Sequence, residues 1–315
     1  MTAPSLARQS AGAFSARLDA LAAEVDDLLD RLLAGEREPG EIARPTRLLE
    51  AMRYASLGGG KRLRPFLVAE SAALFAVPPE RALMAGAALE CVHCYSLVHD
   101  DLPAMDNDDL RRGQPTTHKA FDEATAILAG DALLTFAFDV VAREEAHPSA
   151  SVRIALVSEL ARAAGIGGMA GGQLLDLAAE GRFGGKRKLG EKEIAALQAM
   201  KTGALIRFAC RAGAILGGAD EASLAALDRY GNTIGQAYQI ADDLLDVAGE
   251  TATVGKATGK DAAAGKATLV AALGRDAAQT RLTALVKEAE AALEPFGAPA
   301  ETLKAAAHFI AARRK

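Results

Sequence analysis

Two short aspartate clusters, 142 positions apart, contain the residues of this chain best suited to chemistry. They read Asp100-Asp101-Leu-Pro-Ala-Met-Asp106 and Asp242-Asp243-Leu-Leu-Asp246. Each cluster follows an apolar, helix-forming run, so each places several carboxylates near the end of a buried helix. Like charges in that position are costly unless a cation joins them. Because Mg²⁺ commonly bridges one or two carboxylates to a substrate phosphate, the clusters predict a site for a metal-bound phosphate.

The two clusters are expected to differ in backbone geometry. Asp242 and Asp246 are four residues apart and share a helix face, which Gln239 joins three residues before the cluster. Pro103 does not continue a helix comfortably, so Asp106 is expected in the turn beyond the first helix. A lone Asp-Asp-x-x-Asp is also common as a solvated helix end, so this pattern alone does not identify a metal site.

Basic residues gather where they could bind the phosphate itself. Arg111 and Arg112 follow the first cluster closely. A guanidinium group can donate two parallel hydrogen bonds to the oxygens of one phosphate. The segment Gly58–Pro65 (GGGKRLRP) combines glycines, which permit close backbone approach, with cations at a helix start. Further cations are Lys201, Lys256, Lys260 and Lys266. Local charge neutralisation and an ordinary basic helix start remain alternatives for the first two elements.

Composition and charge indicate an all-α protein. Half of the 315 residues are hydrophobic, Trp is absent, and no convincing strand alternation appears. The formal net charge of -5 argues against a nucleic-acid partner. No apolar run of about 18 residues predicts a spanning helix, so no stable membrane association is expected. The first residues do not follow the pattern of a secretory signal, and the three cysteines form no disulfide framework, which favours a cytoplasmic location.

Helical periodicity predicts one domain. Residues 1–10 are expected to be flexible, and residues 11–315 to form a single large helical bundle around a central active-site cavity. The expected helices span residues 11–34, a segment ending near 57, and 65–76, 79–102, 122–145, 149–164, 166–179, 191–216, 220–248, 266–272, 276–294 and 299–312. Cys91, His93 and Cys94 could suggest zinc, but they lack a second ligand pair and lie in an apolar helical run.

Taken together, the motifs resemble the trans-isoprenyl diphosphate synthase family, and within it the bacterial farnesyl diphosphate synthases. The matching segments are GGGKRLRP at 58–65, HCYSLVHDDLPAMDNDDLRRGQPTTH at 93–118, AGDALL at 129–134, GGQLLDL at 171–177, KTGAL at 201–205, GQAYQIADDLLD at 235–246 and VGKATGKDAAAGKAT at 254–268. Each segment alone is weak, but the joint match in this order is highly specific.

The resemblance implies an isoprenoid synthase-like fold and a prenyltransferase. Such an enzyme condenses isopentenyl diphosphate head to tail with dimethylallyl or geranyl diphosphate, giving farnesyl diphosphate (C15) and diphosphate. It also implies Mg²⁺, about three ions per active site, and a homodimer. The implied catalytic residues are Asp100, Asp101, Asp106, Lys201, Asp242 and Asp243, and the implied metal ligands are these aspartates with Asp246.

The same resemblance assigns the two substrates to different residues. The allylic diphosphate falls to Arg111, Lys201, Thr202, Gln239, Lys256, Lys260 and Lys266, and isopentenyl diphosphate, without metal, to Lys61, Arg64, His93 and Arg112. Tyr95 and Ser96 are expected to limit chain length, and Arg313-Arg314-Lys315 resembles a basic tail that closes over the site. The alternative for His93 is a core histidine with a satisfied hydrogen bond.

Other activities remain as alternatives. A geranyl or geranylgeranyl diphosphate synthase would share every motif. A terpene cyclase would need an aromatic-lined pocket to stabilise carbocations, and this chain has only 10 Phe and 4 Tyr. A non-catalytic regulatory subunit would be expected to lose its aspartate ligands, whereas both clusters are complete.

Overall fold

The computed structural model describes residues 3–185, 189–252 and 268–313, and it confirms the all-α prediction. The chain divides into two compact units. One consists of Ser15–Ala69 and Val77–Val157, and is called the first unit below. The other, the second unit, consists of Met1–Phe14, Glu70–Ala76 and Ser158–Lys315. Helices α1 (Ala3–Leu32), α3 (Leu63–Ala73) and α7 (Ala150–Ala164) contribute residues to both units.

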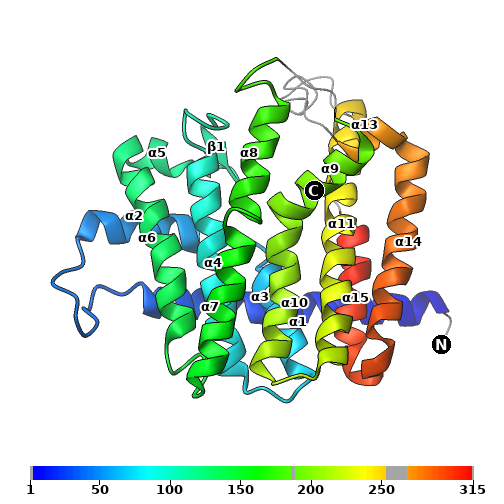
Figure 1. Ribbon diagram of the computed structural model, residues 1–315, viewed down its shortest axis with the longest axis horizontal. Helices are drawn as coiled ribbons and strands as arrows, with labels where there is room; N and C mark the ends of the chain where they lie inside the picture. Colours follow the sequence, from blue (N-terminus) through cyan, green and yellow to red (C-terminus); the bar gives the residue numbers. More distant parts are fainter. Residues whose placement is uncertain (1–2, 186–188, 253–267, 314–315) are drawn as a thin grey trace. The chain divides into compact units, whose positions relative to one another are not determined.

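The first unit is built around a helix pair that lies side by side in Figure 1, α4 (Pro79–Asp100) and α6 (Glu123–Ala142). Helix α2 (Thr46–Leu57) packs on both, and the short α5 (Thr117–Ala120) packs on α6. Proline in the first turn suits the start of α4, because a backbone N–H at that position has no partner within the helix and proline has none to leave unpaired. Asp122 caps α6 by accepting a hydrogen bond from the Thr125 N–H at 2.8 Å. These helices fix the positions of the first aspartate cluster.

Helix α6 is apolar enough to correct one expectation from the sequence. By length and composition alone it could cross a membrane, although no such run was expected. The core helix of a soluble protein passes the same test. One face of α6 is buried against its neighbours, including Ala126, Leu133 and Val140. The packing of α6 within its unit therefore accounts for the apolar residues on this face, whereas Ile127 and Leu128 are exposed.

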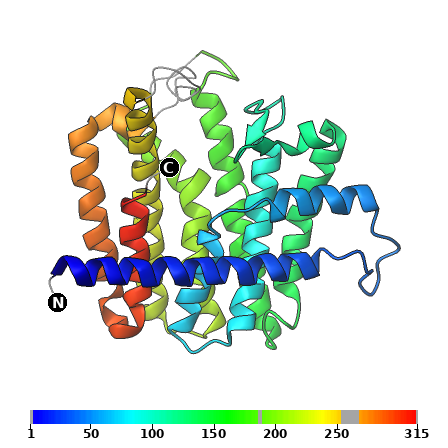
Figure 2. The same ribbon diagram turned by 180° about the vertical axis from the view of Figure 1, so that it is seen from behind.

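The second unit is organised around α11 (Glu221–Ala252), the helix that carries the second aspartate cluster. Helices α10 (Ala204–Leu216), α14 (Arg275–Leu293) and α15 (Glu301–Ala311) pack along α11, as both views show (Figures 1 and 2). Its remaining described elements are α8 (Met169–Ala179), α9 (Glu191–Gln198), a π-helix (Ala199–Gly203), α13 (Leu269–Leu273) and two 3₁₀ turns (Glu294–Phe296 and Ala298–Ala300).

Most of the expected helices are present, with three differences. Helix α1 begins at Ala3, whereas the first helix was expected from residue 11. The stretch 191–216, expected as one helix, is interrupted by the π-helix. No strand was expected, yet β1 (Leu110–Arg111) and β2 (Gln114–Pro115) form an antiparallel hairpin. Two-residue strands are too short for alternation to be visible in a sequence.

We predict that Tyr230→Phe lowers the free energy of unfolding. Tyr230 is completely buried in α11, and its hydroxyl donates to the Leu303 carbonyl of α15 at 2.6 Å. Loss of this bond should cost about 1 kcal/mol, measured by urea denaturation. Tyr54→Phe is the matched control because the Tyr54 hydroxyl makes a similar 2.7 Å bond to the Pro115 carbonyl in an exposed setting. An equal loss in both variants would contradict the prediction.

Candidate active site

The first aspartate cluster lies at the end of α4. Asp100 is the last helical residue, and Asp101 is the C-cap with a nearly buried side chain. The chain then turns, and the Asp106 N–H donates to the Asp100 carbonyl at 2.8 Å. Asp106 therefore lies beyond the helix, in agreement with the expectation from Pro103.

The hairpin after this cluster directs two consecutive arginines to different partners. Arg112 and Gly113 both have positive φ, 52° and 79°, as a type I′ turn requires. Arg111, on the strand before the turn, donates through Nε and Nη2 to the carboxylate of Asp101 at 2.6–2.9 Å. Arg112, at the turn, donates to the Gly59 carbonyl. The resemblance likewise assigned these two arginines to different substrates.

The pKa of Asp101 reflects both its burial and this arginine. Burial raises the pKa of the carboxyl, and the hydrogen bond and charge of Arg111 offset only part of that rise. Because Arg111 offsets the effect of burial only in part, a further cation near Asp101 would stabilise its charged form.

The residues assigned to isopentenyl diphosphate gather in the first unit. A Cβ placed on Gly60, next to Lys61, would lie 2.8 Å from Nη1 of Arg112, so the glycine-rich loop and the hairpin touch. Burial, and then the charges of Arg64 and Arg112, lower the pKa of His93 well below its usual range. His93 is therefore neutral at neutral pH and would offer an anion a hydrogen bond rather than a charge. Nε of Arg64 is buried without a hydrogen-bond partner.

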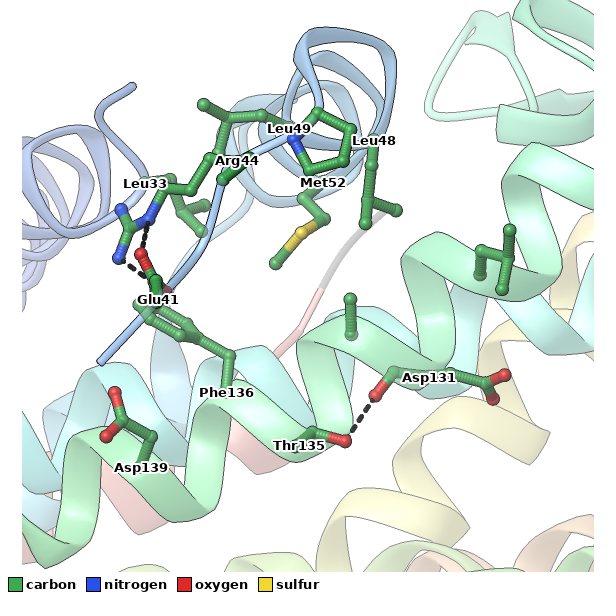
Figure 3. Close-up of a pocket in the computed structure, with 14 residues that line it drawn as sticks. Leu33, Glu41, Arg44, Leu48, Leu49, Met52, Asp131, Thr135, Phe136 and Asp139 are labelled. Carbon is green, nitrogen blue, oxygen red and sulfur yellow. Dashed lines mark hydrogen bonds and ion pairs between the residues drawn. The ribbon is translucent and has the colours of Figure 1, made fainter. Parts of the chain in front are cut away.

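Two pockets of the first unit differ in their relation to these residues. One, of about 440 Å³, is lined by Asp101, Arg111 and Arg112 together with parts of α2 and α4. The other, of about 520 Å³, is shown in Figure 3, where Met52 and Phe136 lie on its apolar wall. None of the site residues expected from the sequence lines this second pocket, so the chemistry points to the first one.

The residues expected to limit chain length lie on α4 before the aspartates. The Tyr95 ring packs edge-on against His99, with ring centroids 5.8 Å apart. His99 in turn lies over Gly130 of α6, where a Cβ would be only 2.1 Å from the imidazole Nε2. The Ser96 hydroxyl donates to the His93 carbonyl of its own helix at 2.8 Å. Gly130 thus gives His99, and through it Tyr95, a defined position.

The second aspartate cluster lies within α11, and its carboxylates have different partners. Asp242 accepts a hydrogen bond from Nη2 of Arg313 at 3.0 Å, and the same guanidinium stacks on the Tyr238 ring at 4.0 Å. Asp243 is buried and accepts from the Gln198 amide at 3.1 Å and the Leu269 N–H at 3.2 Å. The contact of Arg313 agrees with a basic tail that reaches the site.

Lys201 and Thr202 lie in the π-helix of the second unit. Nζ of Lys201 pairs with the nearly buried carboxylate of Asp176 on α8 at 2.5 Å. A Cβ on Gly172 of α8 would be 2.3 Å from the Lys201 backbone nitrogen. The glycine therefore lets α8 approach the widened turn, and π-turns of this kind are frequent at functional sites.

The donor chemistry of the aspartates fits Mg²⁺. Burial, and to a lesser degree the neighbouring Asp242 and Asp246, raises the pKa of Asp243 to about 6, although hydrogen bonds from neutral groups oppose the rise. Among the described residues, no group of three carboxylate, imidazole or thiol side chains forms a ready-made metal site. Mg²⁺ is commonly held by one or two carboxylates with substrate phosphates and water, so this arrangement suits ions that arrive with a diphosphate.

Not every residue expected in the site can be placed. Lys256, Lys260 and Lys266, and Arg314 and Lys315 of the tail, lie outside the described residues. The first unit holds the residues expected from 61 to 112, and the second unit holds Lys201, Thr202, Gln239 and the second cluster. Sequence reasoning did not single out Asp176, Gln198 or Gly130, although GGQLLDL and AGDALL contain two of them.

Comparison with known proteins first defines the class. A crystal structure of an FPP/GFPP synthase from Zymomonas mobilis matches with a TM-score of 0.85 and 44% identity over 96% of this chain and all of the other. The class is therefore the all-α isoprenyl synthases. The polyprenyl synthetase family model matches residues 45–296, and the chain belongs to that family.

Individual relatives agree with this membership. The chain is 45% identical to farnesyl diphosphate synthase of Escherichia coli over 275 residues, 86% of this chain and 90% of the relative. It is 40% identical to farnesyl diphosphate synthase of Geobacillus stearothermophilus over 270 residues, 85% of this chain and 89% of that protein. The resemblance inferred from the motifs is confirmed.

We predict that Asp243→Asn stabilises the protein in a pH-dependent way when a chelator is present. The folded-state pKa of Asp243, about 6, lies above the ordinary 3.8, so the protonated carboxyl favours the folded state. This contribution to stability is complete below about pH 4 and is lost as the pH rises through 6. The variant should therefore gain stability over the wild type between pH 4 and 7, by at most about 3 kcal/mol. Urea unfolding of both proteins across this range measures the difference. A difference that is constant with pH would contradict the prediction.

Proposed function

We propose that this chain condenses isopentenyl diphosphate with dimethylallyl or geranyl diphosphate and releases farnesyl diphosphate and diphosphate. One observation carries the proposal: the first unit contains both a carboxylate suited to a metal ion and basic groups suited to a diphosphate. Asp101 at the end of α4 suits a metal, while Arg64 and Arg112, whose charges help to lower the pKa of His93, suit a diphosphate directly. The names of the relatives agree with this reaction and with the prenyltransferase class.

The residues of this chain would divide the work as follows. Asp100, Asp101, Asp106, Asp242, Asp243 and Asp246 would hold Mg²⁺. When bound, Mg²⁺ would neutralise the diphosphate that leaves the allylic substrate. Arg111, Lys201, Thr202 and Gln239, with Lys256, Lys260 and Lys266, would bind the allylic diphosphate. Lys61, Arg64, His93 and Arg112 would orient isopentenyl diphosphate so that its double bond meets the allylic carbon.

The internal ion pairs describe how the site is prepared for these ligands. Arg111 is paired with Asp101, Lys201 with Asp176, and Arg313 with Asp242. Diphosphate and Mg²⁺ would exchange for the partners in the first of these pairs: Arg111 would gain a phosphate oxygen, and Asp101 would gain a metal. Because charge is matched in this pair before and after, the exchange would leave neither group uncompensated.

We also propose a homodimeric, cytoplasmic enzyme. Large apolar side chains on α6 and α7 are exposed, among them Leu128 (57%) and Ile154 (68%), which supports a further protein surface against the first unit. Sedimentation or light scattering of the purified chain tests the oligomeric state.

A single assay tests the reaction. We expect the purified chain to release diphosphate and form farnesyl diphosphate from dimethylallyl and isopentenyl diphosphates with Mg²⁺, and to lose this activity when EDTA is added. Product chromatography distinguishes the alternatives. A cyclic hydrocarbon would indicate a cyclase, a different chain length would indicate a geranyl or geranylgeranyl synthase, and no diphosphate release would indicate a regulatory subunit.

We predict that Tyr95→Ala gives products longer than farnesyl diphosphate. Tyr95 lies five residues before Asp100 on α4, about 7.5 Å along the axis, where its ring would meet the growing tail. Removing the ring opens this space, and chromatography of the products measures the length. Phe136→Ala is the matched control because Phe136 lines the pocket that no expected site residue lines. Tyr95 would not be the limit if its variant made only the wild-type product.

A further inference from the structure

Arg62 lies between two cations assigned to isopentenyl diphosphate but points elsewhere. Lys61 is exposed and Arg64 is partly exposed, whereas the Arg62 side chain is completely buried (0% exposed). Sequence reasoning passed over Arg62 because the motif shows three basic residues without showing which of them faces inward.

The Arg62 guanidinium joins three helices of the first unit. Nε and Nη2 lie 2.8 and 2.6 Å from Oδ1 of Asp26 on α1. Nη1 donates to Oε1 of the buried Glu90 on α4 at 2.7 Å, and Nη2 donates to the Ser56 carbonyl of α2 at 2.5 Å. A planar fork with several donors can hold all three acceptors at once, which a lysine ammonium on a flexible stem cannot do in the same geometry.

These contacts explain the backbone of the loop that carries Lys61 and Arg64. Arg62 has a φ of 47°, in the left-handed region that side chains with a Cβ rarely adopt. Such a conformation persists only where the surroundings hold it. Gly59 and Gly60 before it also have positive φ, 84° and 135°, and Gly60 touches Arg112. The anchored guanidinium therefore fixes the turn on which the neighbouring cations depend.

The charges exclude Arg62 itself as a phosphate ligand. Nε, Nη1 and Nη2 are all engaged by protein acceptors, and two carboxylates surround one guanidinium. This buried cluster, which carries a net negative charge, would repel a diphosphate rather than attract it. Arg62 can influence an anion only through the residues beside it.

We propose that Arg62, held by Asp26 and Glu90, is a positioning residue for isopentenyl diphosphate. It keeps the loop 58–64 in the conformation that directs Lys61 and Arg64 to the diphosphate. This role rests on the proposed function, and it assigns no substrate contact to Arg62. The allylic diphosphate, bound through other residues, does not depend on it.

Asp26→Asn tests this role with little risk to folding, because Asp26 is partly exposed on α1 (38%). The matched control is Asp30→Asn, one helical turn later, which removes the 2.5 Å pair between Asp30 and Arg53 of α2. We expect Asp26→Asn to raise KM for isopentenyl diphosphate about fivefold, because small displacements of a binding group weaken binding strongly. KM for geranyl diphosphate and kcat should stay within about twofold of the wild type, and Asp30→Asn should leave all three unchanged.

A second variant, whose fold is checked by circular dichroism, completes the test. Arg62→Lys should raise KM for isopentenyl diphosphate further than Asp26→Asn, in protein that retains the wild-type circular dichroism spectrum. Equal rises in both KM values, or the same rise in Asp30→Asn, would overturn the positioning role. If the wild type is active and Asp26→Asn has unchanged kinetics, the positioning role is overturned and the proposed function is not. A wild type that does not consume isopentenyl diphosphate would overturn the proposed function as well.

Discussion

Carboxylates buried at or near helix ends need positive charge close by, and much of the local geometry follows from this requirement. At the end of α4 the requirement is met by the hairpin, which returns Arg111 to Asp101. On α11, Asp242 is about half exposed, and it pairs with Arg313, the last described residue. Asp243 instead receives neutral donors, so burial leaves its pKa raised. The positions that lack full compensation are the ones where a divalent cation has most to contribute.

The same physical rule works in the opposite direction around Arg62. There a buried cation needs carboxylates, and Glu90 and Asp26 supply them from α4 and α1. Removing Arg62 would leave both carboxylates without a cation, which costs more than the intact network contributes. The first unit thus contains two kinds of charged cluster: the pair of Asp101 with Arg111, which lines a pocket, and the network of Arg62 with Asp26 and Glu90.

The sequence predicts the helices well because their apolar spacing is long and regular, and it predicts the place of Asp106 because proline has a definite effect on a helix. Three features have no comparable signal. The hairpin at 110–115 is too short to alternate, the π-helix has the same residue types as the α-helices around it, and Arg62 resembles its basic neighbours. The partners of Lys201 and Asp242 are also long-range, so periodicity carries no information about them.

The π-helix at Ala199–Gly203 has a consequence for how this segment can change. A π-turn holds one residue more than an α-turn, which offsets every later position on the helix by about 100°. Phe208 and Cys210, which follow the extra residue, are buried in α10. Point substitutions leave the count intact, whereas a deletion would rotate the whole of α10 out of phase with α11.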